Sequence, residues 1–254
     1  MKPEFEIIDI DADNVDKMGF FCYMSKRKAP GYQQKRQWLE ARFAEGLKIK
    51  MVHEIGGRNT GFIEYIPGEY AWRALYASGY IVIHCLWVVG KGKGKGYASR
   101  LIEACLEDAR VQGKKGVVML ASDRVWLAGK AVFQQNGFKQ VDEYAPFQLL
   151  VQRFDGSPDP TFPNDWDERQ ARFGSGLTVV RTPQCPYIED GAKTVIDTAA
   201  ELGLPAREVE LRSAAEVQTR APSPFGVFSI LRDGQLLSYY YLLPKELKRI
   251  LSNQ

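Results

Sequence analysis

The sequence has few of the residues that bind metals or build disulfide frameworks. Its cysteines and histidines are Cys22, Cys85, Cys105, Cys185, His53 and His84. The cysteines are widely spaced and form no Cys-x-x-Cys pair, so the usual zinc-binding patterns are excluded. We therefore expect no metal site, and we expect reduced thiols instead of stabilising disulfides.

Long apolar runs and a strong excess of one charge are also missing. No window of about 18 residues is uninterruptedly apolar, and the start, MKPEFEIIDIDADN, lacks the apolar segment of a signal peptide. We therefore expect a soluble, cytoplasmic protein that does not enter a membrane. The 34 Lys and Arg residues nearly balance the 31 Asp and Glu residues, so the net charge alone requires no nucleic-acid partner.

The length and composition favour one large or two small globular domains. The chain has 254 residues, and 45% of them are hydrophobic, which excludes general disorder. The clearest break lies between Phe154 and Gly176, where Pro, Gly and Asp are frequent and no apolar period is sustained. This predicts a first domain at residues 1–155, a linker at 156–175 and a second domain at 176–254.

Strands and helices alternate in the first part. The patterns predict strands at 6–10, 48–55, 60–66, 80–89, 117–121 and 148–154, and helices at 33–45, 98–112 and 126–135. The run at 80–89 is continuously apolar, which is typical of a strand covered on both faces. The helix at 98–112 places Leu101, Cys105 and Ala109 on one side. We expect a mixed α/β domain of the α+β type.

The second part shows a shorter series of elements. The patterns predict strands at 177–181, 206–211, 225–231 and 235–240, and helices at 186–202, 213–219 and 244–252. Asp233-Gly234 between the last two strands is a strong hairpin signal. The expected order is therefore β-α-β-α-β-β-α.

A loop rich in glycine and lysine is the most informative segment. It runs from Gly90 to Gly96 as Gly-Lys-Gly-Lys-Gly-Lys-Gly, between the apolar strand and the amphipathic helix. Glycines let the backbone turn tightly and approach a ligand, and a helix N-terminus favours an anion. Lys91, Lys93 and Lys95 add positive charge. The segment predicts a pyrophosphate site, although neither the GxGxxG nor the Walker pattern is present.

The spacing Lys91-Gly-Lys-Gly94-Lys-Gly96 resembles the acyl-CoA pyrophosphate loop of GNAT-superfamily acyltransferases, with Lys where Arg or Gln is usual. The likeness continues through the following helix, the strand at 117–121 and the junction Phe133–Phe138. It implies a fold with a mixed sheet in which the strands at 80–89 and 117–121 run parallel and splay apart. Acetyl-CoA or another acyl-CoA would be the co-substrate, with no metal, and its pantetheine arm would lie between the two strands.

The resemblance also implies which residues bind the donor. These are Leu86, Trp87, Val88, Val89, Lys91, Gly92, Lys93, Gly94, Lys95, Gly96, Tyr97 and Phe133. A backbone N–H near the end of the strand would polarise the thioester carbonyl, and the amine of a small-molecule acceptor would attack it directly in a ternary complex. A base would take the proton of the amine, and an acid would protonate the CoA thiolate.

The base and the acid remain open. Many members use a Tyr on the last helix as the acid, but this chain has Phe133 there, so Ser122 and Tyr144 are the candidates. For the base we consider His84, whose ordinary pKa lies near neutrality, and Glu64. The alternatives are that His84 is a hydrogen-bonded core residue, that Glu64 is an ordinary exposed carboxylate, and that a water relay takes the proton.

Two further features of the first part bear on function. Strand alternation would point His84 and Cys85 to opposite faces, so we expect no nucleophile–base pair and interpret Cys85 as a small apolar residue. The segment from Lys26 to Arg42 carries six basic residues and one Glu. This is a solvated helix face or, alternatively, a surface for a tRNA-borne aminoacyl donor, which some GNAT-fold enzymes use.

The second part resembles a thioredoxin- or glutaredoxin-like unit. Cys185 in Gln184-Cys185-Pro186 lies at a predicted helix start, where a thiolate is favoured, and Pro224 stands where that family has a cis-proline. Position 188 is Ile, so the resolving cysteine is missing, and monothiol chemistry or a packing role remains. Together the two parts resemble the YoaP-type N-acetyltransferases. The remaining alternative is a non-catalytic thiol- or ligand-sensing module.

Overall fold

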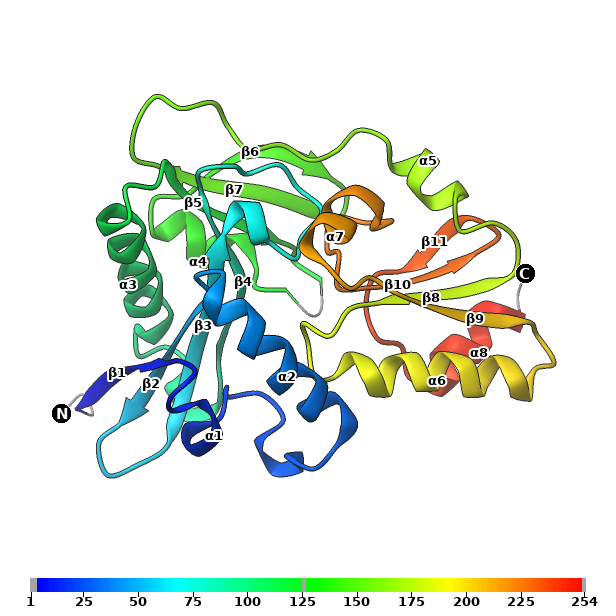
Figure 1. Ribbon diagram of the computed structural model, residues 1–254, viewed down its shortest axis with the longest axis horizontal. Helices are drawn as coiled ribbons and strands as arrows, with labels where there is room; N and C mark the ends of the chain where they lie inside the picture. The colour runs from blue at the N-terminus through cyan, green and yellow to red at the C-terminus, as the bar shows by residue number, and fades with distance from the viewer. Residues whose placement is uncertain (1–3, 125–126, 253–254) are drawn as a thin grey trace. The chain divides into compact units, whose positions relative to one another are not determined.

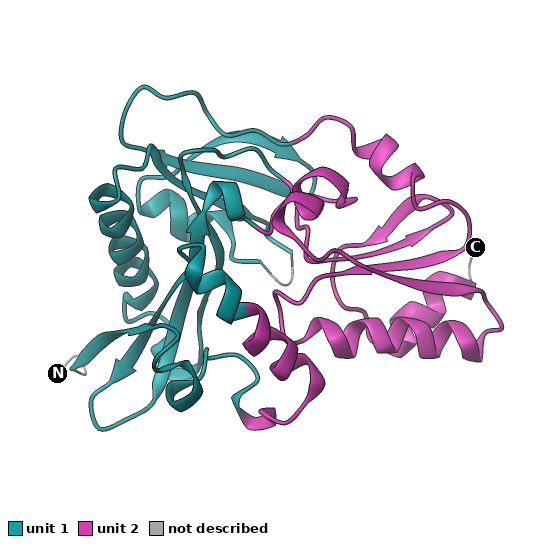
Figure 2. Cartoon of the chain, in the orientation of Figure 1, with its two compact units in different colours: residues 1–24, 39–71, 75–162 teal, residues 25–38, 72–74, 163–254 magenta. Residues whose placement is uncertain are grey.

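The computed structural model describes residues 4–124 and 127–252 (Figure 1), which form two compact units (Figure 2). The first unit contains residues 1–24, 39–71 and 75–162, and the second contains 25–38, 72–74 and 163–254. The second unit therefore includes two short segments from the part of the chain in which the sequence places the first domain. Among the described residues, no helix is both long and apolar enough to span a membrane.

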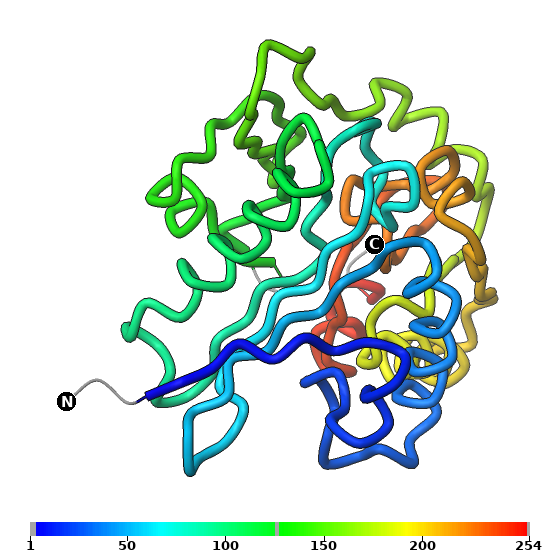
Figure 3. Tube along the Cα trace, turned by 60° about the vertical axis from the view of Figure 1, so that its left-hand side comes forward, coloured from blue at the N-terminus to red at the C-terminus, as the bar shows by residue number. Residues whose placement is uncertain are grey.

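The first unit is built on a seven-stranded sheet in the order β1-β2-β3-β4-β5-β7-β6. Its strands are β1 (Phe5–Ile10), β2 (Lys48–Glu54), β3 (Asn59–Pro67), β4 (Ile81–Val88), β5 (Gly116–Ala121), β6 (Lys139–Tyr144) and β7 (Phe147–Arg153). Figure 3 shows β1 to β4 side by side. Only the pair β4–β5 is parallel, and the other neighbours are antiparallel. The six predicted strands are confirmed, and β6 was not predicted.

Helices accompany this sheet. They are α1 (Val15–Met18), α3 (Tyr97–Val111) and α4 (Lys130–Gln135), with 3-10 turns at Met24–Lys26, Gly68–Tyr70 and Gly90–Gly92; α2 (Pro30–Ala44) begins in the second unit and ends in the first. Leu101, Cys105 and Ala109 of α3 are fully buried in one core with residues of β2 to β5, as the sequence period predicts. The predicted helix at 126–135 starts at Lys130, and Trp126 lies outside the described residues.

A polar network ties α3 to the sheet at the edge of this core. Asp108 on α3 accepts hydrogen bonds from the Tyr65 hydroxyl and from Lys48, whose Nζ is 3.0 Å away, and the Lys50 ammonium lies 3.4 Å from the same oxygen. Burial alone would raise the pKa of Asp108, but the hydrogen bonds from Tyr65 and Lys48 and the charge of Lys50 hold it below its ordinary value. The carboxylate is therefore charged although it is partly buried.

The second unit contains a four-stranded sheet in the order β11-β10-β8-β9. Its elements are α5 (Trp166–Ala171), β8 (Leu177–Arg181), α6 (Ile188–Glu201), β9 (Ala206–Glu210), α7 (Ala214–Arg220), β10 (Phe228–Arg232), β11 (Gln235–Ser238) and α8 (Pro244–Ser252). From β8 onward they follow the predicted β-α-β-α-β-β-α order. The pair β8–β9 is parallel, and β10 is antiparallel to both β8 and β11.

The two inserted segments pack closely within this unit. A Cβ on Gly31 would lie 2.1 Å from the carbonyl oxygen of Pro186, so only glycine fits at this point of α2. The N–H of Ala74 donates to the carbonyl of Pro224 over 3.2 Å. The expected cis bond at Pro224 is wrong, because the cis peptide bond in the described chain joins Ala145 and Pro146.

Candidate active site

The neighbouring strands β4 and β5 are paired over only part of their length. Ile81, Val82 and Ile83 pair with residues 117–119, but β4 continues to Val88 and β5 to Ala121 without further pairing between them. The prediction that these strands run parallel and then separate is confirmed. Beyond Ile83, the side of β4 that faces β5 carries backbone groups that the sheet does not use.

A β-bulge in β4 directly follows the last pair with β5. Along β3, Glu64 is opposite Cys85, while the next residue, Tyr65, is opposite Ile83, so His84 is the extra residue. A bulge bends its strand and increases the local twist. We infer that this extra residue is the physical reason why β4 turns away from β5.

The bulge also corrects the expected alternation of side chains. Ile83 and Leu86 both lie in the core beneath α3, although three positions separate them. Two residues, His84 and Cys85, therefore face the opposite side of the sheet, where a regular pleat would place only one. The expectation that their side chains point to opposite faces was wrong because it assumed an unbroken period of two.

His84 and Glu64 form a buried pair on this face. The His84 Nδ1 atom is 3.2 Å from Glu64 Oε1, and the two residues are 1% and 2% exposed. The alternative of an exposed Glu64 is thus excluded, whereas the alternative of His84 as a hydrogen-bonded core residue agrees with this burial and contact. A carboxylate that holds one imidazole nitrogen fixes the ring orientation and stabilises the protonated ring, as a general base requires. Of the four candidate catalytic residues, these two are brought together.

Ser122 and Tyr144 occupy other parts of the sheet. Ser122 follows β5, is fully buried, and accepts the N–H of Arg124 through its Oγ over 3.2 Å. Tyr144 ends β6, which is separated from β4 by β5 and β7, and is half-buried. Phe133 on α4 is fully buried and packs edge-on against Phe138, with ring centroids 5.4 Å apart. The position at which the resemblance implies a tyrosine acid is therefore occupied by Phe133, whose side chain cannot donate a proton.

The glycine–lysine loop joins β4 to α3. Gly90, Gly94 and Gly96 have positive φ angles of 54°, 77° and 84°, which glycine adopts without strain. A Cβ on Gly92 would lie 3.0 Å from the Thr60 Cβ, so this position needs glycine for close packing. Gly96 is the N-cap of α3 and offers no side-chain cap, so the first amides of the helix have no capping oxygen.

The three lysines of the loop have different environments. Lys91 and Lys93 are exposed. The Lys95 ammonium instead lies 2.7 Å from Glu54 Oε1, which also accepts a hydrogen bond from the Tyr97 hydroxyl over 2.9 Å. These hydrogen bonds from Lys95 and Tyr97 lower the pKa of Glu54. Sequence reasoning missed Glu54, because no local pattern connects β2 with the loop.

The donor residues implied by the resemblance on β4 divide between the two faces. Leu86 is buried beneath α3, and Val88 packs against the same core. Trp87 points to the opposite face and is 43% exposed. Val89 is half-buried and donates its N–H to the carbonyl of Thr60 over 2.8 Å.

Cys185 in the second unit lies in a turn before α6. The helix begins at Ile188, whose N–H donates to the Cys185 carbonyl over 3.2 Å, and the cysteine is partly buried. Glu189 in the first turn of α6 lies 3.4 Å from the Arg181 guanidinium. The carboxylate of Glu189 is therefore balanced by a positive charge.

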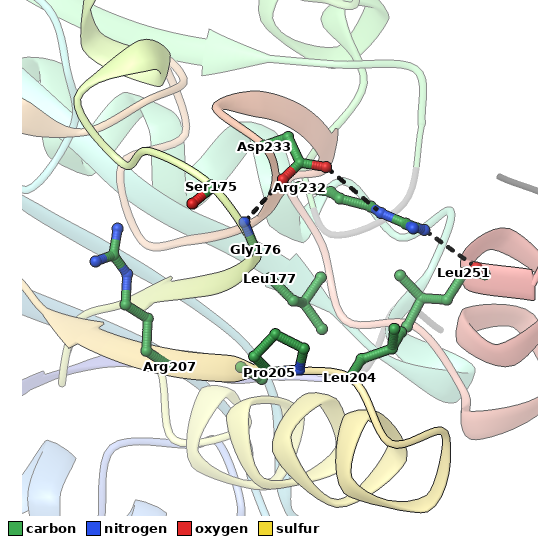
Figure 4. Close-up of a pocket in the computed structure, with 10 residues that line it drawn as sticks. Ser175, Gly176, Leu177, Leu204, Pro205, Arg207, Arg232, Asp233 and Leu251 are labelled. Atoms are coloured by element: carbon green, nitrogen blue, oxygen red, sulfur yellow. Dashed lines mark hydrogen bonds and ion pairs between the residues drawn. The ribbon is translucent and has the colours of Figure 1, made fainter.

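A cavity of about 510 Å³ also lies in the second unit (Figure 4). It is lined by Ser175, Gly176, Leu177, Leu204, Pro205, Ala206, Arg207, Arg232, Asp233 and Leu251. Arg232 donates to the carbonyl of Leu251 over 3.1 Å, and Asp233 accepts the N–H of Gly176 over 2.8 Å. Within the described chain, no cluster of three or more His, Cys, Asp or Glu side chains is arranged to hold a metal ion.

Comparisons with known proteins agree on one family. Residues 15–138 match the model of the acetyltransferase (GNAT) family. The chain is also 30% identical, over 249 residues, to a protein of Bacillus subtilis (strain 168) described as the uncharacterized N-acetyltransferase YoaP. The match covers 96% of this chain and 98% of the relative.

Solved structures with a similar fold include a GNAT family acetyltransferase from Brucella melitensis in complex with acetyl-CoA. It is 19% identical, has a TM-score of 0.41, and the match covers 63% of this chain and 97% of that one. Another is the PaiA N-acetyltransferase from Thermoplasma acidophilum in complex with coenzyme A. It is 11% identical, has a TM-score of 0.43, and the match covers 59% of this chain and 99% of that one.

Proposed function

Because the chain belongs to the acetyltransferase (GNAT) family, whose members are acyl-CoA-dependent N-acyltransferases, we propose that it transfers an acetyl group from acetyl-CoA to the amine of a small molecule. The amine attacks the thioester directly while donor and acceptor are both bound. The observation that carries this proposal is the separation of β4 from β5 beyond Ile83, next to a loop that feeds the uncapped N-terminus of α3.

The loop from Gly90 to Gly96 binds the diphosphate of the donor. The first amides of α3 supply N–H donors and the helix dipole, and the exposed Lys91 and Lys93 supply charge. The pantetheine arm then lies between β4 and β5, where the backbone groups of residues 86–88 can bond it. This arrangement directs the thioester toward the bulge, where the strands separate.

The His84–Glu64 pair acts as the base. A backbone N–H of β4 polarises the thioester carbonyl, the amine attacks the acyl carbon, and His84 takes the amine proton while Glu64 stabilises the charged imidazole. The C–S bond breaks and CoA leaves as a thiolate. Phe133 cannot protonate it, so the proton comes from Ser122, Tyr144 or water.

Replacement of His84 tests this mechanism. His84→Gln keeps a polar side chain of similar size but removes the base, so we expect kcat to fall about 10²–10⁴-fold. CoA should still raise the melting temperature, because the diphosphate site is unchanged. The measurement is acetyl-CoA-dependent release of CoA thiol over a panel of primary amines, beside thermal unfolding with and without CoA.

His53→Gln is the matched control for this experiment. His53 lies on β2, outside the proposed site, with its Nδ1 atom 2.9 Å from Asn59 Oδ1. Its variant should keep both activity and CoA binding. If His84→Gln retained full turnover, the proposed base would be refuted. If CoA raised the melting temperature of neither the native protein nor the variants, the proposed donor site would be refuted.

For residues 176–254, which make up most of the second unit, we propose a thioredoxin-like domain, joined by a linker at 156–175 to an acyltransferase domain at 1–155. The strand order β11-β10-β8-β9, with β8 parallel to β9 and helices between the strands, supports this fold. Ile188 stands where a resolving cysteine would be needed for dithiol chemistry. We therefore assign this domain a packing role, and Cys185 no part in acetyl transfer.

A further inference from the structure

Three aromatic rings form a cluster on the first unit. Phe62 of β3 is directly opposite Trp87 of β4. The Phe21 ring stacks on Phe62 with centroids 4.9 Å apart and meets Trp87 edge-on at 6.0 Å. Phe62 is buried, but Trp87 is 43% exposed and Phe21 is half-buried. The cluster therefore offers an apolar aromatic surface that a ligand can reach.

The cluster adjoins the His84–Glu64 pair. Phe62 and Glu64 are two residues apart on β3, and both point away from the α3 core that holds Ile63. Trp87 and Cys85 are likewise two residues apart on β4, and Cys85 is paired with Glu64. Two residues along a strand span about 7 Å. The backbone positions of Phe62 and Trp87 thus lie about 7 Å along their strands from those of Glu64 and Cys85, and the rings are on the same face of the sheet as the proposed base.

An unusual turn places Phe21 in this cluster. Phe21 and Tyr23 both have positive φ angles, 76° and 60°, although neither is glycine. Such a conformation is unfavourable for a residue with a Cβ atom. This turn holds the Phe21 ring against Phe62 and beside Trp87.

The two substrates of the proposed transfer approach from different faces. The diphosphate site is at the N-terminus of α3, and α3 covers the face that holds Leu86 and Val88. The base and the three rings are on the other face. The rest of an acceptor molecule whose amine reaches His84 therefore lies next to Trp87. The donor lies on the other face of the sheet and does not contact this cluster.

We propose that the acceptor is a primary amine whose aromatic group packs against Phe21 and Trp87 and is joined to the nitrogen by a short alkyl linker. This inference rests on the proposed acetyl transfer and names its acceptor class. The linker is short because the aromatic cluster adjoins the His84–Glu64 pair on one face of the sheet. Aromatic pairs favour stacked or edge-on contacts of the kind that Phe21 and Trp87 already make with each other.

The test compares acetylation of 3-phenylpropylamine, 2-phenylethylamine, propylamine and ethanolamine by the full-length protein with acetyl-CoA. We expect kcat/KM for the better aryl amine to exceed that for propylamine at least about ten-fold, because the ring loses apolar surface to water. Trp87→Ala should reduce this ratio to about two- or three-fold, and Trp87→Phe should restore most of it. Tyr76→Ala is the matched control, because Tyr76 is 53% exposed and lies outside the cluster, and it should leave the ratio unchanged.

The outcomes separate this inference from the function on which it rests. A native protein that binds CoA but prefers propylamine, or acetylates none of the four amines, would overturn the acceptor class alone. A ratio that survives Trp87→Ala would do the same. A native protein that is neither stabilised by CoA nor active on any amine would overturn the proposed function together with the acceptor class.

Discussion

The glycine–lysine loop leads to a sharp prediction, because its three lysines look equivalent in sequence and differ in structure. Lys91 and Lys93 are exposed, whereas Lys95 is held 2.7 Å from Glu54. If the loop binds a diphosphate, the double variant Lys91→Ala, Lys93→Ala should bind CoA much more weakly. Lys95→Ala should have little effect, since Lys95 would have to leave Glu54 before it could reach a phosphate.

The size of the effect follows from the exposure of the two free lysines. A contact between unit charges about 4 Å apart in a water-like environment contributes about 1 kcal/mol. Loss of two such contacts gives about 2 kcal/mol, which corresponds to a roughly 30-fold higher Kd for CoA. For Lys95→Ala we expect a change of less than about three-fold.

Isothermal titration of CoA into the native protein and both variants measures these differences. The titration should be repeated at low and high salt, because exposed charges are screened within about 8 Å at 0.15 M ionic strength. The native protein should lose affinity with salt more steeply than the double variant does. The reasoning would be refuted if Lys95→Ala weakened binding as much as the double variant, or if the double variant bound CoA normally.

Three further changes test other parts of the structure. Asp108→Asn removes a charged acceptor from the Tyr65–Lys48–Lys50 network and should lower the free energy of unfolding by about 1.5–3 kcal/mol in urea titrations at pH 7. The pKa of Asp108 is lower in the folded state than its unfolded value of about 3.9. The stabilisation by this carboxylate is therefore present above a pH of about 3.9 and is lost as the pH falls through the lower folded-state pKa. In that pH range the free energy of unfolding of the variant should depend less on pH than that of the native protein. The side chain introduced by Gly92→Val should collide with Thr60 and Val88, lower the free energy of unfolding by about 1–3 kcal/mol and weaken CoA binding. A melting temperature and a Kd for CoA equal to those of the native protein would contradict this packing argument. Cys185→Ser should retain full acetyl transfer in the thiol-release assay, and a large loss of turnover would show that the thiol takes part.

The sequence predicted well those elements whose periods are regular. The helix α3 carries buried residues four positions apart, and β4 is a continuous apolar run, so both were identified within one or two residues of their ends. The glycine–lysine loop was identified for the same reason, since glycines at alternate positions between a strand and a helix leave a clear local pattern. The structure of each of these elements is determined by residues within one continuous segment.

Features that depend on two distant segments were missed. The edge strand β6 has a mostly polar sequence, KQVDEY, and gives no apolar alternation. The bulge at His84 depends on how β4 aligns with β3, which no single strand reveals. The contact of Lys95 with Glu54 joins positions 41 residues apart, and it separates one lysine of the loop from the other two.

The bulge in β4 has a consequence for how this sheet tolerates change. With one of the two residues His84 and Cys85 removed, β3 and β4 would align one to one, and Leu86 and Val88 would still face α3. The shortened strand would also lose the bend that parts it from β5, so its ladder could extend past Ile83. The separation of β4 from β5 thus depends on one inserted residue, and its deletion is expected to close the space in which the proposed thioester would lie.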